Sequence, residues 1–328
     1  MTEPMTLVRI VKDWDWPDLL RQTPDQKGVW NGLRFTMDEV GECDYLIMLN
    51  NRMKVATTAL CPPENVWVLM QEPYERGFSD WVVEGHDPFA KVLTHHRPVD
   101  SPKYVASHPA IPWHVNRTFD QLTACSIPEK RKGLSWIVGD AMDLPGHRRR
   151  WSFLEDIKKA KLPIDLFGKK IRYLQDKWDG LASYRYSLAI ENNSGPDMWT
   201  EKLADCFLAW TLPFYYGCTN LEDYFPAGSF VRIDITKPEA SLEKIRAAMA
   251  GEAWKMSLPA LEEARNLVLR KYQIFPYLSG LIGEQSKGDG LKKEIRIPPY
   301  KRSMKASWHH LEYKFKKKRD RWRSKKIW

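Results

Sequence analysis

Acids, amides and a lysine gather in one short stretch near the middle of the chain. The stretch runs from Leu188 to Lys202 and contains Glu191, Asn192 and Glu201. Carboxylates and amides can hold the hydroxyl groups and bases of a nucleotide, and a lysine adds positive charge beside a phosphate. This combination favours a site for a phosphorylated, nucleotide-containing ligand.

These residues fall where a strand is expected to give way to a helix. Residues 186–190 alternate and then run apolar, as a buried strand does, and residues 199–210 carry apolar side chains at helical spacing. We expect a turn over residues 192–196 and an N-cap at Asp197. Ligands of open α/β sheets bind beyond the carboxyl ends of strands, and helix N-termini attract phosphate. The segment therefore predicts a phosphate-binding turn.

The same segment resembles the signature of the α-1,3/1,4-fucosyltransferase family, glycosyltransferase family 10, in its bacterial cytoplasmic type. That signature is a Glu-Asn-Ser turn followed by Tyr-x-Thr-Glu-Lys, which here reads Glu191-Asn192-Asn193 and then Met198-Trp199-Thr200-Glu201-Lys202. The likeness continues in order through residues 209–217 and 220–230. It implies that Asn192 and Glu201 orient a nucleotide-sugar and that Lys202 neutralises its diphosphate. Met198, which replaces the usual tyrosine, leaves one contact to the donor open.

A run of three arginines, residues 148–150, precedes the apolar face of another expected helix. A guanidinium group can bind phosphate oxygens in a bidentate manner. Counted back from Ile157, Arg150 falls on the family's arginine that meets the donor pyrophosphate, and Arg149 is the substitute within the run. The alternative is a solvated helix face. Since arginines oppose the helix dipole at an N-terminus, a bound anion would compensate for them.

A glutamate follows a short apolar strand in the first half of the chain. Residues 66–70 are expected to form the strand, which ends at Gln71-Glu72-Pro73. This resembles the family's Trp-x-Trp-Met-x-x-Glu-Ser-Pro element, whose glutamate is the candidate general base. A carboxylate at a strand end that faces a cleft can remove a proton from an attacking hydroxyl group. Glu75 is the rival candidate, and an ordinary solvated loop acid is the alternative.

With 328 residues, of which 43% are hydrophobic, the chain is long enough for two domains. We expect an N-terminal acceptor-side α/β domain over residues 1–130 and a donor-nucleotide-binding Rossmann-like domain over residues 131–280. Residues 281–328 form a linker and a basic aromatic tail. Residues 121–133 are the expected linker between the domains. Together with the resemblance, this implies an α/β, GT-B-like fold with two Rossmann-like domains facing across a cleft.

No cofactor is expected beyond the donor substrate, GDP-fucose. Asp13-Trp14-Asp15 matches the Asp-x-Asp pattern by which other transferases hold a metal, but it lies early, beside a predicted strand end. Cationic side chains and a helix N-terminus can stabilise a leaving diphosphate without a divalent ion. We therefore expect no metal site and no essential divalent metal. The five cysteines contain no Cys-x-x-Cys pair and imply neither a disulfide framework nor zinc.

The excess positive charge is concentrated in residues 291–328. They contain 15 Lys/Arg and 3 Asp/Glu, so this segment alone has a net charge of +12, whereas the whole chain has +9. One predicted helical face carries Trp308, Leu311, Phe315 and Trp322. A basic helix with an aromatic stripe suits an anionic membrane surface. A disordered solubilising tail is the alternative, and nucleic acid is the rival partner, which we do not expect because the chain has no recognisable nucleic-acid motif.

The sequence has no apolar run near the length of about 20 residues that crosses a bilayer, and its N-terminus lacks signal-peptide features. We therefore expect a cytoplasmic protein, peripheral on the inner face of the cytoplasmic membrane. The resemblance to the fucosyltransferase family implies inverting transfer of fucose from GDP-fucose to a hydroxyl group of a saccharide acceptor, which we expect to be a surface glycan or a lipid-linked precursor. Another GDP-sugar donor, or a non-catalytic membrane-associated nucleotide-sugar-binding protein, stays open as an alternative.

Overall fold

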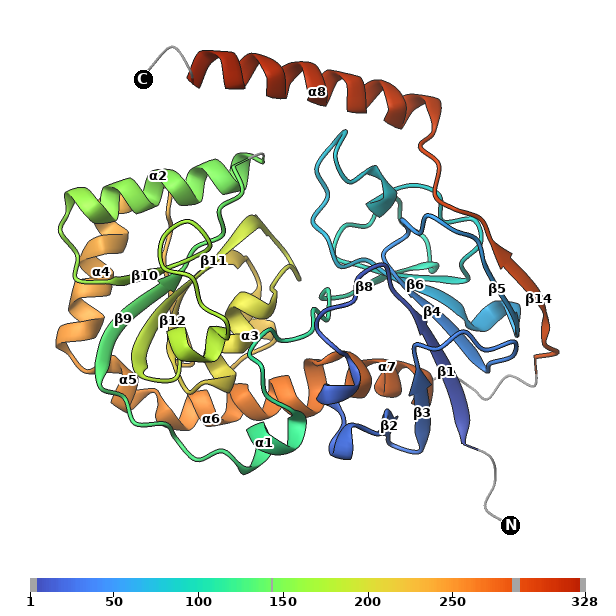
Figure 1. The fold of residues 1–328 in the computed structure, drawn as a ribbon, viewed down its shortest axis with the longest axis horizontal. Helices are drawn as coiled ribbons and strands as arrows, with labels where there is room; N and C mark the ends of the chain where they lie inside the picture. The colour runs from blue at the N-terminus through green and yellow to red at the C-terminus, as the bar shows by residue number, and fades with distance from the viewer. Residues whose placement is uncertain (1–4, 143, 285–289, 325–328) are drawn as a thin grey trace. The chain divides into compact units, whose positions relative to one another are not determined.

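The computed structural model describes residues 5–142, 144–284 and 290–324, and the chain divides into two compact units (Figure 1). The first unit takes in residues 1–16, 28–109 and 279–328. The second unit takes in residues 17–27 and 110–278. This division differs from the expected boundaries at 130/131 and 280/281, because the chain passes between the units more than once.

Side-chain and backbone contacts explain the early crossing at residues 17–27. The Arg21 guanidinium donates to the Trp113 carbonyl at 2.5 Å, and the Asp25 amide donates to the Asp120 carboxylate at 2.8 Å. The Gln273 side chain donates to the Gln22 carbonyl at 3.0 Å. These bonds attach the segment to the second unit although its sequence neighbours belong to the first.

The first unit is built on a seven-stranded sheet in the order β2-β3-β1-β4-β6-β7-β8. Every neighbouring pair is parallel except β2 and β3. The central strands β4 and β6 are buried along their whole length, which is typical of a parallel sheet covered on both faces. The strands are β1 Thr6–Val11, β2 Val29–Trp30, β3 Leu33–Thr36, β4 Tyr45–Leu49, β6 Val66–Leu69, β7 Lys91–Thr94 and β8 Tyr104–Ala106.

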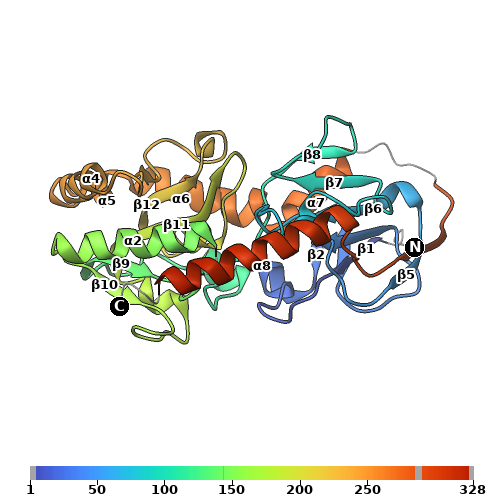
Figure 2. The same cartoon turned by 90° about the horizontal axis from the view of Figure 1, so that it is seen from above.

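The C-terminal part of the chain also belongs to the first unit. Strand β14, Lys293–Ile297, pairs antiparallel with β5, Thr57–Cys61, in a separate two-stranded sheet (Figure 1). Helix α8, Met304–Ser324, follows as one uninterrupted helix (Figure 2). The described part of the basic tail therefore contains a strand and a long helix, which belong to the first unit.

The second unit contains a five-stranded sheet in the order β10-β9-β11-β12-β13, in which all neighbours are parallel. Its strands are β9 Lys132–Ile137, β10 Asp165–Phe167, β11 Tyr184–Gly195, β12 Leu212–Cys218 and β13 Val231–Arg232. Its helices are α1 Phe119–Ala124, α2 Pro145–Lys159, α3 Glu201–Leu208, α4 Pro238–Ala250, α5 Ala253–Met256 and α6 Leu258–Leu267. Helix α7, Ile274–Gly283, contains the boundary between the two units at residues 278/279. Helix α2 packs against β11, and α3 packs against β11, β12 and α6.

The structure confirms the α/β class and the presence of two parallel-sheet units, as the GT-B-like expectation requires. The expected linker at residues 121–133 is wrong, because the whole range lies inside the second unit and α1 occupies its first part. Thr118 and Gln121 cap α1 reciprocally, with bonds of 2.9 and 3.2 Å between side chains and backbone amides. Within the described ranges, none of the helices combines the length and the apolar character required of a membrane span.

Candidate functional site

The sheet of the second unit has one topological switch point, between its neighbouring strands β9 and β11. From β9 the chain passes through α2 to β10 on one side, and from β11 it passes through α3 to β12 on the other side. Right-handed crossovers in opposite directions place the two helices on opposite faces of the sheet. The crevice at the carboxyl ends of the two strands is where open α/β sheets bind ligands. This point defines the candidate site.

Strand β11 bulges where it reaches the switch point. Ile190 lies opposite Tyr216 and Gly195 lies opposite Cys218, so several residues of β11 stand out of register with β12. Glu191, at the start of the bulge, is 2% exposed, and its carboxylate accepts from the Thr200 amide at 2.8 Å and from the Thr200 hydroxyl at 2.9 Å. Glu191 therefore fixes the start of α3.

The N-cap of α3 is Thr200, and the expectation of Asp197 in this role is wrong. Asp197 has a left-handed backbone, with φ of 59°. Its carboxylate accepts from the Asn220 side chain at 2.9 Å and from the Tyr224 hydroxyl at 2.7 Å. Asp197 thus ties the turn before the helix to the segment after β12. The spacing of apolar residues could not show this, because the partners are distant in sequence.

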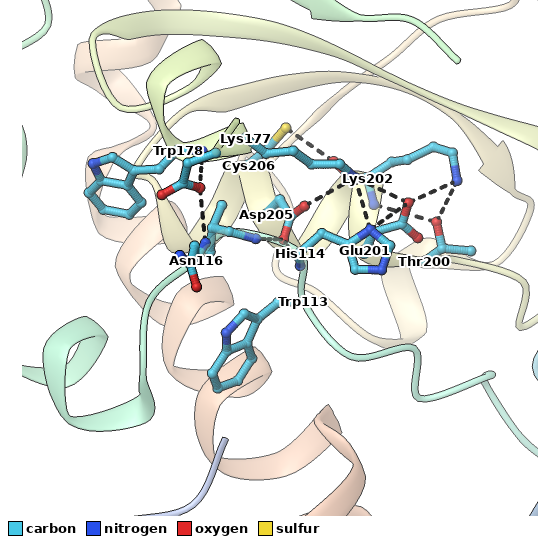
Figure 3. Close-up of polar contacts among 12 residues, drawn as sticks. Trp113, His114, Asn116, Lys177, Trp178, Thr200, Glu201, Lys202, Asp205 and Cys206 are labelled. Atoms are coloured by element: carbon cyan, nitrogen blue, oxygen red, sulfur yellow. Dashed lines mark hydrogen bonds and ion pairs between the residues drawn. The ribbon is translucent and has the colours of Figure 1, made fainter. Parts of the chain in front are cut away.

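Lys202 and Glu201 lie in the first turn of α3 (Figure 3). Their side chains are 23% and 12% exposed. The Lys202 ammonium lies 3.2 Å from the Glu191 carboxylate and 3.4 Å from Glu201 Oε1. Burial lowers the pKa of the Lys202 amine, but the two carboxylates outweigh it and hold the pKa above its usual range. For the Glu201 carboxylate the directions are reversed. Burial raises its pKa, but the positive charges of Lys202 and Lys177 outweigh burial and hold the pKa well below its usual range. Both groups are therefore ionised at neutral pH.

Arg150 stands apart from the two arginines that precede it. Arg148 and Arg149 are exposed, whereas Arg150 is 4% exposed. Among the described residues, its Nε has no hydrogen-bond partner. Burial lowers the pKa of the Arg150 guanidinium, and the charges of Glu191 and Glu201 oppose this shift. A buried guanidinium with donor capacity to spare is costly unless an acceptor meets it, so the position suits a bound anion.

Asn192 brings the bulge of β11 against the start of α2. Its Oδ1 is buried and has no hydrogen-bond partner in the described part of the chain. A β-carbon placed on Gly146 would lie 1.5 Å from the Asn192 carbonyl oxygen. Only glycine allows this approach, which brings α2, the helix that carries Arg150, next to β11 at the switch point.

We expect Gly146→Ala to lower the free energy of unfolding by about 1–3 kcal/mol, because the added methyl group must displace the backbone of Asn192. Gly195→Ala is the matched control, since a β-carbon there meets nothing within 4 Å. Denaturant unfolding of both variants measures the difference. Equal unfolding midpoints for Gly146→Ala and Gly195→Ala would contradict the close contact.

A second group of polar and charged residues lies beside Glu201 and was not singled out from the sequence (Figure 3). The Lys177 ammonium lies 3.4 Å from Glu201, 3.5 Å from Asp205 and 3.1 Å from His114 Nδ1. Burial lowers the pKa of His114 to about 3, so the neutral ring can accept from Lys177. Burial raises the pKa of Asp205 to about 6.

Asp205 also joins α3 to the segment that precedes α1. Its Oδ1 accepts from the backbone amides of His114 and Val115 at 2.8 and 3.3 Å. A cavity of about 30 Å³ lies beside it and is lined by Lys177, Lys202 and Asp205 together with apolar residues of β9 and β11. The one available sequence signal was the placement of Asp205 one helical turn after Glu201, on the same face of α3.

In the first unit, Glu72 follows β6 at the carboxyl edge of the sheet and is exposed. The preceding residue is held in place, because the Gln71 amide donates to the Asn50 side chain at 2.9 Å. The rival Glu75 is half-buried. Asp13 forms an ion pair with Arg52 at 2.6 Å. Across the described ranges, no group of three or more His, Cys, Asp or Glu side chains is arranged to hold a metal.

Residues 127–249 match the family model described as glycosyltransferase family 10 (fucosyltransferase), C-terminal part. The chain is 29% identical to 4-galactosyl-N-acetylglucosaminide 3-alpha-L-fucosyltransferase 9 of Mus musculus over 123 residues. The matched segment covers 36% of this chain and 33% of the mouse protein. Over 88 residues the chain is 35% identical to a putative fucosyltransferase-like protein of Arabidopsis thaliana, which is 26% of this chain and 17% of that protein.

Among solved structures, the chain is similar to an alpha1,3-fucosyltransferase with GDP-fucose, with a TM-score of 0.48, 14% identity, and coverage of 84% of this chain and 94% of that one. The sequence matches span about a third or less of the length of the curated relatives. The segment that matches the family model contains Arg150, Asn192, Glu201 and Lys202, and it does not contain Glu72 or the basic tail.

Proposed function

We propose that the protein is an inverting glycosyltransferase that transfers fucose from GDP-fucose to a hydroxyl group of a saccharide acceptor. The observation that carries this proposal is that two cations lie at the topological switch point: a buried guanidinium whose Nε has no hydrogen-bond partner among the described residues, and an ammonium group. Arg150 and Lys202 supply these charges on α2 and α3, within the segment that matches the fucosyltransferase family model. Two cations at such a point suit the diphosphate of a nucleotide-sugar.

In the proposed reaction the acceptor oxygen attacks the anomeric carbon while the bond from that carbon to the diphosphate oxygen breaks. The bonding electron pair leaves with GDP, which gains one negative charge. Arg150 and Lys202 stabilise that charge as it develops. Glu72 takes the proton of the acceptor hydroxyl group, and attack opposite the leaving group inverts the anomeric centre.

Asn192 and Glu201 orient the nucleotide-sugar in this proposal. The Asn192 Oδ1 is a buried acceptor and Glu201 is an ionised acceptor, so both suit hydroxyl or N–H donors of the nucleotide. The Lys177 ammonium forms an ion pair with Glu201 at 3.4 Å and thereby positions its carboxylate. No cofactor is consumed, and we propose that the two cations make a divalent metal unnecessary for departure of the diphosphate.

Calorimetric titration with GDP-fucose tests the donor site directly. Arg150→Met should weaken binding by about 10- to 100-fold, since hydrogen bonds to charged groups contribute about 1.5–3 kcal/mol. Arg149→Met should change it less than about twofold, because exposed charge pairs contribute little. Stronger loss with Arg149→Met would move the role to the neighbouring arginine. Tight binding of GDP-mannose in place of GDP-fucose would favour the alternative donor.

We also propose that α8 binds the surface of an anionic membrane, at its inner face in the cytoplasm, where the acceptor would be a lipid-linked or surface glycan precursor. Trp308 and Phe315 are 64% and 72% exposed on a helix that carries many lysines. Aromatic side chains at the lipid boundary and basic residues near anionic headgroups both favour binding.

We expect the protein to co-sediment with vesicles that contain phosphatidylglycerol and not with vesicles of phosphatidylcholine alone. Raising the salt concentration should release it, since each basic residue contributes about 1 kcal/mol through a screened interaction. Trp308→Ala combined with Phe315→Ala should weaken binding to the vesicles, because both side chains are exposed on α8. Ser307→Ala, at an exposed neighbouring position, is the matched control. Binding to RNA without any binding to vesicles would contradict the proposal.

A further inference from the structure

The loop over residues 71–86 carries Glu72 and is held together by its own hydrogen bonds. The Ser79 hydroxyl donates to the Pro73 carbonyl at 2.7 Å and accepts from the Glu75 amide at 2.8 Å. The Gly77 amide donates to the Asp80 carboxylate at 3.0 Å. Ser79 and its neighbour Asp80 therefore connect the second half of the loop to Pro73, the residue that follows Glu72.

The segment between β14 and α8 binds the far side of this loop. Glu84 accepts from the Tyr300 hydroxyl at 2.6 Å, from the Ser303 hydroxyl at 2.7 Å and from the Ser303 amide at 3.1 Å. The Arg302 guanidinium lies 3.6 Å from Asp80, whose side chain is 2% exposed. Hydrogen bonds to a charged acceptor and an ion pair to a buried carboxylate are stronger than ordinary surface contacts.

Helix α8 itself packs on the tip of the loop. A β-carbon placed on Gly77 would lie 2.3 Å from the His309 carbonyl oxygen, and Gly77 has φ of 79°, so the helix backbone rests against a position that requires glycine. The His310 ring donates from Nδ1 to the Gly77 carbonyl at 2.7 Å. The rings of Phe78 and Tyr313 lie 5.8 Å apart.

The two faces of α8 have different surroundings. Ala306, which is 3% exposed, lies on the helical face of His309, His310 and Tyr313, because these positions follow it by three, four and seven residues. Trp308 lies on the other face and is 64% exposed, as are Leu311 and Phe315 in large part. The inner face is therefore committed to the loop, and the basic aromatic stripe stays outward.

We propose that the C-terminal segment, residues 300–313, is a positioning element for the loop that carries Glu72, so that proton removal from the acceptor depends on the docked α8. This inference rests on the proposed function of Glu72. Its contacts hold the loop at Glu84, Asp80 and Gly77, and all of these residues belong to the first unit, whereas the proposed donor-binding residues belong to the second. Displacing α8 should therefore lower the transfer rate without weakening donor binding.

Ala306→Glu tests this proposal, because it inserts a charged side chain into the buried inner face. Ser307→Glu is the matched control, since it adds the same charge to the same helix at an exposed position. Hydrogen exchange of the amides in residues 71–86 is measured with kcat for a soluble saccharide acceptor and with the Kd for GDP-fucose, in the absence of lipid. If Ala306→Glu fails to fold, Tyr300→Phe combined with Ser303→Ala takes its place.

We expect faster exchange in the loop and a kcat lowered by about tenfold or more in Ala306→Glu, because small misplacements of a reacting group can cost up to about 100-fold. The Kd should stay within about twofold of the wild-type value, and Ser307→Glu should match wild type in all three measurements. Wild-type exchange and kcat in Ala306→Glu would overturn the proposal. If Ala306→Glu showed faster exchange in the loop but the wild-type protein showed no transfer activity, the docking of α8 on the loop would stand and the proposed function would be wrong.

Discussion

Glu72→Gln is expected to lower kcat for transfer by about 10²- to 10⁴-fold, the usual contribution of a general base. Glutamine keeps the size of the side chain and cannot accept the proton of the acceptor hydroxyl group. The Kd for GDP-fucose should stay near the wild-type value, because Glu72 belongs to the first unit and the proposed donor residues belong to the second. Steady-state kinetics and calorimetric titration together separate the two effects.

Glu75→Gln completes this test. Glu75 lies in the same loop, and its backbone amide already serves the loop by donating to Ser79 at 2.8 Å. We expect its substitution to leave kcat within a few-fold of wild type, as is usual for an acid that takes no part in proton transfer. A large loss with Glu75→Gln and none with Glu72→Gln would assign the base to the rival glutamate.

Lys202→Met is expected to lower kcat by about 10²- to 10³-fold, the cost of removing one group that stabilises developing negative charge. The ammonium lies in the first turn of α3, with its side chain 23% exposed, so a diphosphate at the switch point can reach it. The variant should still fold. Burial already raises the pKa of Glu191, so that carboxyl group can take up a proton once its partner is lost.

Lys158→Met is the matched control for Lys202→Met. Lys158 lies on α2, its side chain is 52% exposed, and it forms a surface ion pair with Glu155. Its substitution should leave both kcat and the thermal midpoint near wild type. If Lys202→Met kept near-normal turnover while folded, the proposed role of this residue in departure of the diphosphate would be wrong.

The expected positions of strands were close to the structure wherever apolar runs were strong. Residues 66–70 and 186–190 read as buried strands, and β6 and β11 occupy them. Helix α3, Glu201–Leu208, lies inside the expected range of residues 199–210. It ends before Trp210, which adopts a left-handed backbone with φ of 57°. Local patterns of hydrophobicity carry this information, whereas backbone turns that depend on distant partners do not.

The division of the chain into units was beyond the reach of local patterns. Residues 17–27 belong to the second unit because of bonds to Trp113, Asp120 and Gln273, all far away in sequence. The tail belongs to the first unit because β14 pairs with β5. Composition marked the tail as basic and aromatic, but it gave no sign of the strand that attaches it.

The candidate site shows the same limit. The expected donor-binding residues lie at the start of α3, in the bulge of β11 and on α2. The sequence offered both Arg149 and Arg150 as the arginine that meets the diphosphate, and only the structure separates them, because Arg149 is exposed and Arg150 is buried. Lys177 and His114 were missed because nothing in their local sequence marks them. Only folding brings them next to Glu201 and Asp205. Donor binding by Arg150, Asn192, Glu201 and Lys202 stays a prediction, which the titration with GDP-fucose tests.

Release of GDP from GDP-fucose by the purified protein is the most direct test of the central claim. The assay uses galactose- and N-acetylglucosamine-containing acceptors, with GDP-mannose as the control donor. We predict release that is specific for GDP-fucose, rises with an acceptor and falls in Glu72→Gln and Lys202→Met. Binding of GDP-fucose without release, in the presence of every acceptor, would contradict the transferase and leave a nucleotide-sugar-binding protein.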